Sequence, residues 1–297
     1  MMRESVSLEV PMPPGPATYA VTRWPATGAP AGAPALVAAH GIAANSLTWA
    51  PVASKLPDVD VIAPDLRGRG LSREVRGPYG MAVHADDLIR AMDHLGVERA
   101  VVAGHSMGGW VAAVAAVRHP DRFTGALLID GGLGFPLPDG VDLEALLEGM
   151  LGPVMRKLRT TFASREEFIE PWRTHPAFAG AWTPEIAAYL SRDIVGAEPQ
   201  LRSACVAEAV RADAADELRN PEVVSAIRRI PVPATFLHAE RGLMNEPAGL
   251  YRPEVVEAAD LGALGIDVRF QPGTNHYSIL LGDDGAAAVA DAVRGLL

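Results

Sequence analysis

The stretch that decides the fold is Ala100-Val101-Val102-Ala103-Gly104-His105-Ser106-Met107-Gly108-Gly109-Trp110-Val111-Ala112. Its first four residues are the apolar run of a buried strand, and an Ala- and Val-rich helix pattern follows. Because the chain must turn within a few residues, we predict a strained backbone at Ser106, with room left by Gly104 and Gly108. Such a turn lifts the hydroxyl above the sheet and aims the N–H groups of the helix start at it. The pattern therefore predicts a nucleophilic serine.

Composition limits the class of protein. The 297 residues favour one α/β domain with an insertion, and 49% hydrophobic residues suffice for a large core. A net charge of −10 without a basic cluster argues against a nucleic-acid partner. The single cysteine, Cys205, excludes an internal disulfide and indicates a reducing compartment. No signal-peptide pattern and no membrane-length apolar stretch are present, so we expect a soluble cytoplasmic protein with no membrane partner.

Strands and helices alternate along most of the chain. After an antiparallel pair, we predict core strands at residues 35–40, 59–63, 100–104, 126–130, 234–238 and 267–270. The clearest helix places one apolar face on the core, formed by Met81, Ala85, Leu88, Met92 and Leu95. Alternation of this kind predicts right-handed crossovers and a mostly parallel sheet, and therefore an α/β fold.

The alternation stops from Leu133 to Ile230, where only helix signals remain. A capping box begins at Ser164, and Thr183 is an N-cap followed by proline. We predict that residues 1–132 and 231–297 form the core and that 133–230 form an inserted helical cap. Most aromatic residues of this segment should pack against one another, with one or two facing a pocket; they are Phe162, Phe168, Trp172, Phe178, Trp182 and Tyr189.

Four stretches of the chain resemble the α/β-hydrolase superfamily, in order and spacing as well as in sequence. They are Ala39-His40-Gly41-Ile42, residues 64–72, the serine turn, and Pro272-Gly273-Thr274-Asn275-His276-Tyr277. The chain is most similar to capped, cofactor-free members such as carboxylesterases and lactonases. The resemblance implies an eight-stranded sheet flanked by helices, with the cap inserted after strand 6. Asp65, Arg67, Gly68 and Gly70 resemble a signature of the superfamily, and we interpret them as structural, with Arg67 tying loops together.

A serine hydroxyl is a poor nucleophile, so it needs a base within reach and a carboxylate that orients the base. In this superfamily the order along the chain is nucleophile, acid and histidine. His276 suits the role of the base because it follows the last predicted strand, in a loop that can place the imidazole over the sheet edge. His238, at the end of a strand, is the competitor. His105 is expected to point away from Ser106.

Two residues are candidates for the carboxylate that orients the histidine. Most of the superfamily carries an aspartate beyond the strand at 234–238, where this chain has Gly242, with Glu240 two residues earlier. Asp130 ends the preceding core strand, and some relatives, including certain haloalkane dehalogenases and a mycotoxin lactonase, carry their acid there. The same position also suits a residue that only caps a turn. Asp130 is favoured, and Glu240 is the alternative.

The tetrahedral intermediate of acyl transfer needs two N–H donors. The resemblance assigns them to the backbone of Ile42 and Met107. The sequence has no His-x-x-x-His or Cys-x-x-Cys spacing, no phosphate loop and no dinucleotide fingerprint. We therefore expect no metal and no cofactor.

A serine at position 106 indicates acyl chemistry, whereas a dehalogenase or epoxide hydrolase would need an aspartate there. We predict a serine hydrolase that cleaves a small apolar ester or lactone through an acyl-enzyme, as a monomer or homodimer. One alternative is other chemistry at the same serine, such as carbon–carbon bond hydrolysis, acyl transfer or perhydrolysis. The other is a non-catalytic small-molecule receptor.

Overall fold

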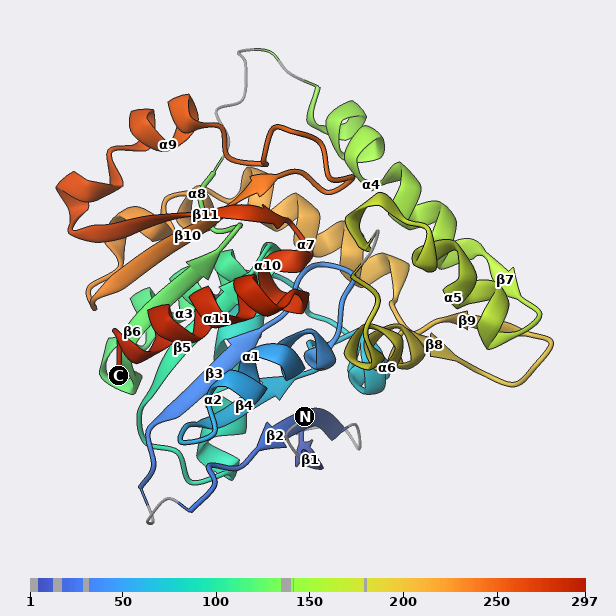
Figure 1. The fold of residues 1–297 in the computed structure, drawn as a ribbon, viewed down its shortest axis with the longest axis horizontal. Coiled ribbons are helices and arrows are strands. Elements are labelled where there is room, and N and C mark those ends of the chain that lie inside the picture. The colour runs from blue at the N-terminus through green and yellow to red at the C-terminus, as the bar shows by residue number, and fades with distance from the viewer. Residues whose placement is uncertain (1–4, 13–17, 29–31, 135–139, 141, 179–180) are drawn as a thin grey trace.

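A computed structural model of the chain describes residues 5–12, 18–28, 32–134, 140, 142–178 and 181–297. At its centre is an eight-stranded sheet in the order β1-β2-β4-β3-β5-β6-β10-β11 (Figure 1). Neighbours from β4 to β11 in this order are parallel, whereas β2 runs antiparallel to β1 and β4. The strands are β1 (Val6–Pro11), β2 (Thr18–Trp24), β3 (Ala35–Ala39), β4 (Asp60–Pro64), β5 (Ala100–His105), β6 (Phe123–Ile129), β10 (Ala234–Arg241) and β11 (Ile266–Asn275). The predicted fold class is confirmed.

Helices cover both faces of this sheet (Figure 1). One face is covered by α2 (Met81–His94) and α3 (Met107–Arg118), and the other by α1 (Ala50–Lys55), α10 (Ser278–Leu281) and α11 (Asp283–Arg294). Four of the five apolar positions that predicted α2 are buried in it, whereas Leu95 is half-buried and follows the helix end. Leu88 and Met92 share a cluster with Val111 of α3. Each such side chain contributes about 1.5–3 kcal/mol through burial. These two layers fix the sheet edge at which the site is built.

The segment between β6 and β10 is an insertion that adds no strand to the main sheet within its described residues. Its elements are α4 (Leu143–Arg159), β7 (Thr161–Phe162), α5 (Arg165–Arg173), α6 (Pro184–Arg192), β8 (Ile194–Val195), β9 (Leu201–Ser203), α7 (Ala207–Arg219) and α8 (Pro221–Val224). The expectation of helices alone is wrong, because β7, β9 and β8 form a separate antiparallel sheet. Strands of two or three residues are too short to leave an alternating pattern. Residues 135–139, 141 and 179–180 of the predicted cap lie outside the described residues.

The two helix starts predicted inside the insertion are confirmed. The Ser164 hydroxyl accepts a hydrogen bond from the Glu167 N–H at 3.1 Å, at the start of α5. The Thr183 hydroxyl accepts one from the Ile186 N–H at 3.3 Å, at the start of α6. Each cap satisfies one N–H that the helix itself cannot bond, which contributes about 1 kcal/mol.

A buried ionic cluster fixes α7 against the core. Asp213 accepts a hydrogen bond from the Gly80 N–H at 2.6 Å and lies 2.9 Å from Nε2 of His84 on α2. Its Oδ2 also lies 2.6 Å from Nη1 of Arg69, and both side chains are fully buried. Burial alone would raise the pKa of Asp213, but His84 and Arg69 lower it to about 2. The carboxylate is therefore ionised, and α7 cannot separate from the core without exposing or unpairing it.

One turn further along α7, Glu217 has no such compensation. Its Oε2 is buried and has no hydrogen-bond partner among the described residues. Burial, followed by the charge of Asp213, raises the pKa of Glu217 to about 8. The folded protein therefore holds this carboxyl protonated at neutral pH, whereas an exposed glutamate in the unfolded chain is ionised.

We predict that the Glu217 carboxyl weakens the fold as pH rises from about 4.5 to 8. The unfolded chain releases this proton near its ordinary pKa of 4.5 and the folded chain only near 8, so the contribution present at low pH is lost between them. Glu217→Gln does not titrate, and its stability advantage over wild type should grow by at most about 1.4 kcal/mol per pH unit. Denaturant unfolding at pH 5, 7 and 8 measures this difference. A difference that stays constant with pH would contradict the assignment.

Candidate active site

The serine turn between β5 and α3 has the strained geometry that the sequence predicts. Ser106 has φ 55° and ψ −126°, a backbone conformation that side-chain-bearing residues rarely adopt. Its N–H donates to the Ile129 carbonyl at the end of β6, at 3.0 Å. A Cβ on Gly104 would overlap the Gly108 carbonyl, and a Cβ on Gly108 would overlap the carbonyl of Ala39 on β3. The two glycines are therefore required by close backbone packing.

The imidazole of His276 meets a carboxylate from another strand end. His276 follows β11, and its Nδ1 lies 2.6 Å from Oδ2 of Asp130, which directly follows β6. Both side chains are buried, and Oδ1 of Asp130 accepts a hydrogen bond from the Ala239 N–H at 3.2 Å. Because a carboxylate can only accept, Nδ1 donates and Nε2 is left as the acceptor of a neutral imidazole. That tautomer is the one a general base requires.

The alternative acid, Glu240, has a different partner. Its Oε2 accepts a hydrogen bond from the Gly273 N–H at 2.8 Å, in an exposed contact. Gly242 stands where the usual aspartate of the superfamily would fall, and it offers no side chain. Of the two carboxylates considered from the sequence, Asp130 is the one hydrogen-bonded to His276.

His105 does not point away from Ser106, and that expectation is wrong. It lines the same cavity as Ser106, and its Nε2 donates to the His276 carbonyl at 2.8 Å. Its ring centroid lies 4.6 Å from that of His276. Burial, and then the charge that His276 can carry, lower the pKa of His105 well below its usual range, so it stays neutral.

Two further histidines occupy structural positions. His40 donates through Nδ1 to the Gly41 carbonyl at 2.8 Å, and its Nε2 accepts a hydrogen bond from the Leu66 N–H at 2.9 Å. Burial lowers the pKa of His40 to about 4, so it acts as a neutral brace between loops. His238, the competitor for the base, lies with its ring 5.3 Å from the ring of Phe270.

One buried guanidinium contacts both residues predicted to supply the oxyanion donors. Residues 41–43, after β3, are called the oxyanion turn below. Arg69 Nε donates to the Ile42 carbonyl at 3.0 Å, and its Nη2 lies 3.9 Å from Sδ of Met107. The opposite side of the same guanidinium pairs with Asp213 of α7. Arg69 therefore connects the oxyanion turn, the start of α3 and the insertion.

Ser106 and His276 line a cavity of about 150 Å³. Four residues of the insertion contribute to its wall, namely Val154, Lys157, Trp172 and Tyr189. Two of the six aromatic residues considered from the sequence therefore face the pocket, as expected for one or two of them. Phe168 and Phe178 are instead buried in an apolar cluster between the insertion and the core, which also contains Ala44 and Leu281. Among the described residues that line the cavity, and leaving aside the histidines, Lys157 is the only one whose side chain is of a type normally charged at neutral pH.

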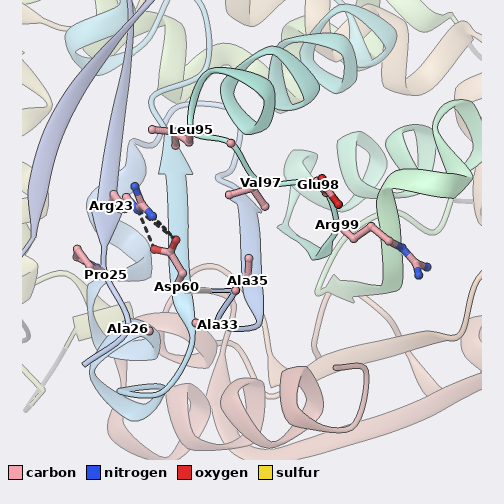
Figure 2. Close-up of a pocket in the computed structure, with 12 residues that line it drawn as sticks. Arg23, Pro25, Ala26, Ala33, Ala35, Asp60, Leu95, Val97, Glu98 and Arg99 are labelled. Carbon is pink, nitrogen blue, oxygen red and sulfur yellow. Dashed lines mark hydrogen bonds and ion pairs between the residues drawn. The ribbon is translucent and has the colours of Figure 1, made fainter. Parts of the chain in front are cut away.

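A larger hollow, of about 570 Å³, lies at the opposite ends of the strands (Figure 2). It opens beside the starts of β3 and β4, against residues 95–99. Arg23 and Asp60 within it pair with each other at 2.6 Å. Its described lining includes no serine, cysteine or histidine, so it offers no nucleophile and no base near neutral pH.

The described residues contain no group of three His, Cys, Asp or Glu side chains placed to hold a metal ion. Within the same part of the chain, no helix combines the length and apolar character needed to cross a membrane.

Comparison with curated proteins gives matches that cover only part of the chain. A 2-hydroxymuconate semialdehyde hydrolase from Pseudomonas is 35% identical over 113 residues, which are 36% of this chain and 40% of that protein. Lipase LipV from Mycobacterium tuberculosis is 30% identical over 122 residues, which are 41% of this chain and 45% of the lipase. The chain thus spans less than half the length of each relative.

Solved structures match over nearly the whole chain. E-2-(acetamidomethylene)succinate hydrolase superposes with a TM-score of 0.77 at 21% identity, covering 98% of this chain and all of that one. An esterase from Thermogutta terrifontis gives a TM-score of 0.65 at 23% identity, covering 99% of both chains. At these identities the likeness concerns the fold. A family model described as the alpha/beta hydrolase fold matches residues 34–168, which include the serine turn and the oxyanion turn. The family model, the sheet order and these superpositions together show that the chain has the α/β-hydrolase fold.

Proposed function

We propose that the protein is a serine hydrolase that cleaves a small carboxylic ester or lactone through an acyl-enzyme. The observation that carries this proposal is that strained Ser106 and the Asp130-bonded His276 line one cavity. His276 Nε2 removes the Ser106 proton as the oxygen attacks the substrate carbonyl, and Asp130 stabilises the imidazolium that forms. The N–H groups of Ile42 and Met107 receive the oxyanion.

The second half of the reaction uses the same groups in reverse. The imidazolium gives its proton to the departing alkoxide, which leaves an ester on Ser106. His276 then deprotonates a water molecule as its oxygen attacks that ester, and the imidazolium returns the proton to the departing Ser106 oxygen, which releases the acid and restores the free serine. A cavity of about 150 Å³ is smaller than the pockets of about 300–1,000 Å³ that hold drug-sized ligands, and this favours a short acyl group.

We propose further that the insertion, residues 133–230, acts as a cap over the serine. Support comes from the four wall residues that α4, α5 and α6 contribute to the cavity. Enclosure of this kind excludes water and strengthens the electrostatic interactions inside the site.

Ser106→Ala should abolish hydrolysis of p-nitrophenyl acetate and butyrate, with a loss on the order of 10⁶-fold in kcat. A fluorophosphonate probe should label the wild type and not this variant. The control is Ser225→Ala, which removes a hydroxyl that bonds only the Pro221 carbonyl and should change neither result. Labelling of Ser106 without ester turnover would favour the alternative chemistry at the same serine. Absence of both would favour the receptor.

Asp130→Asn should lower kcat by about 10⁴-fold, because an amide no longer holds His276 in the required tautomer or stabilises its charged form. Glu240→Gln should have a mild effect, because Glu240 bonds Gly273 in an exposed contact. Steady-state rates of both variants, with circular dichroism to verify folding, give the comparison. The reverse ranking would move the acid to the loop after β10.

Arg69 is proposed to position the oxyanion donors. It holds the Ile42 carbonyl, which fixes the backbone from which the Ile42 N–H projects, and it touches Met107. The chain offers a matched control in Arg67, a buried arginine two residues earlier. Arg67 pairs with Asp87 at 2.7 Å and donates to the carbonyls of neighbouring loops, which confirms its predicted structural role.

Arg69→Lys should lower kcat by about 10²-fold and leave KM nearly unchanged, because the oxyanion forms only after binding. Lysine retains a charge for Asp213 but cannot reproduce the fork that reaches Ile42 and Met107. Arg67→Lys should cost stability and spare kcat. Kinetics with p-nitrophenyl butyrate and thermal denaturation measure the two effects. Equal losses of kcat in both variants would argue that Arg69 is purely structural.

A further inference from the structure

Lysine is rare in this chain, and one of its two positions is in the wall of the serine cavity. The sequence has lysine only at Lys55 and Lys157, although Lys and Arg together number 26. Lys157 lies on α4 and lines the cavity with Ser106. Its Nζ donates to Oδ2 of Asp193 at 2.9 Å, and Asp193 is only 1% exposed.

The surroundings of this ammonium leave it with donor capacity beyond its bond to Asp193. Nζ lies 4.9 Å from the ring centroids of both Phe168 and Trp172, which attract the positive charge without offering an oxygen acceptor. An ammonium has three N–H donors, and among the described residues the hydrogen bonds give it one acceptor, Asp193. A group that fills the cavity can therefore supply an acceptor for Lys157.

Charge decides which kind of acceptor fits. Asp193 already neutralises Lys157, and Asp130 places a further negative charge behind His276. A substrate carboxylate would add a third negative charge to a poorly hydrated site, and desolvating it is costly. A neutral carbonyl oxygen accepts the same hydrogen bond without that cost.

We propose that Lys157 selects substrates in which the group filling the cavity carries a neutral carbonyl oxygen, such as a ketone, a short distance from the scissile ester. The proposal rests on the serine-hydrolase function proposed above and names its substrate class. Lys157 binds and orients the substrate through this second oxygen, while Ser106 and His276 perform the acyl transfer.

The test compares p-nitrophenyl esters of similar size. Pentanoate is apolar, 4-oxopentanoate adds the ketone, and hemisuccinate replaces the terminal methyl of the latter with a charged oxygen. The acetates of 4-hydroxybutan-2-one and 3-methylbutan-1-ol repeat the comparison on the alcohol side. Ratios of kcat/KM between wild type and variant cancel the intrinsic reactivity of each ester.

The variants keep the buried charges balanced. Lys157→Met alone would strand the Asp193 carboxylate, so the test variant combines Lys157→Met with Asp193→Asn. Asp193→Asn alone retains the ammonium and removes its neutralising partner. Lys55→Met is the matched control, because Lys55 pairs with Asp283 away from the cavity. Circular dichroism verifies that each variant is folded.

On one of the two sides of the ester, wild type should prefer the ketone over its apolar match by about tenfold or more, the range of a hydrogen bond from a charged donor. The double variant should lose that preference while still hydrolysing the apolar ester, and Lys55→Met should retain it. Asp193→Asn should keep the preference and improve hemisuccinate relative to 4-oxopentanoate, a change that a purely structural lysine would not produce.

Three results would overturn the proposal. If the double variant keeps the preference for the ketone, Lys157 does not recognise the second carbonyl. The same follows if wild type shows no such preference in either the acyl group or the alcohol group. A wild-type preference for hemisuccinate over 4-oxopentanoate makes the ligand class anionic instead of neutral. If no ester shows Ser106-dependent turnover, the serine-hydrolase function fails and the Lys157 proposal fails with it, and this outcome is distinct from turnover without a preference.

Discussion

The close approach of three backbone segments at the serine turn is the constraint on which the site depends. The ends of β3, β5 and β6 meet there with no space for side chains, as the overlaps expected for a Cβ at Gly104 or Gly108 demonstrate. The hydrogen bond from Ser106 to Ile129 fastens the turn to β6, and Asp130 is the next residue of that strand end. Because this packing sets both Ser106 and Asp130, the relative position of the proposed nucleophile and the proposed acid is fixed by the backbone and not by flexible side chains.

The parts of the fold that the sequence predicted are those governed by local patterns. The apolar runs of the core strands, the apolar face of α2 and the caps at Ser164 and Thr183 each depend on residues close together in the chain. The partner of His276 could only be narrowed to two carboxylates from the sequence, because the choice depends on which strand end lies behind the imidazole. In the folded chain Asp130 lies behind the imidazole, whereas Glu240 accepts a hydrogen bond from Gly273.

The residues that sequence reasoning missed are defined by contacts between distant segments. Arg69 lies in a glycine-rich signature that suggested a structural loop, and its contacts with Ile42, Met107 and Asp213 come from three separate elements. One feature of the sequence could have drawn attention to Lys157, namely the scarcity of lysine in an arginine-rich chain. The insertion also differs from a uniform helical cover. Its α7 is fastened to the core by buried charges, whereas α4, α5 and α6 supply the cavity wall.

The position of Asp130 has a consequence for how the chain can vary. With the carboxylate directly after β6, the serine turn, the oxyanion turn and the proposed acid Asp130 all lie between residues 40 and 130, and of the proposed catalytic residues His276 alone comes from the C-terminal part. In most of the superfamily the loop after β10 must hold an aspartate in register. Here Asp130 bonds His276 instead, so this constraint on the loop is absent. The exposed residues of this loop at 246–248 can be lengthened or replaced without moving Asp130 or His276. Leu243 lines the serine cavity and the half-buried Asn245 accepts a hydrogen bond from Asn275, so new residues beside them can add binding contacts next to the cavity.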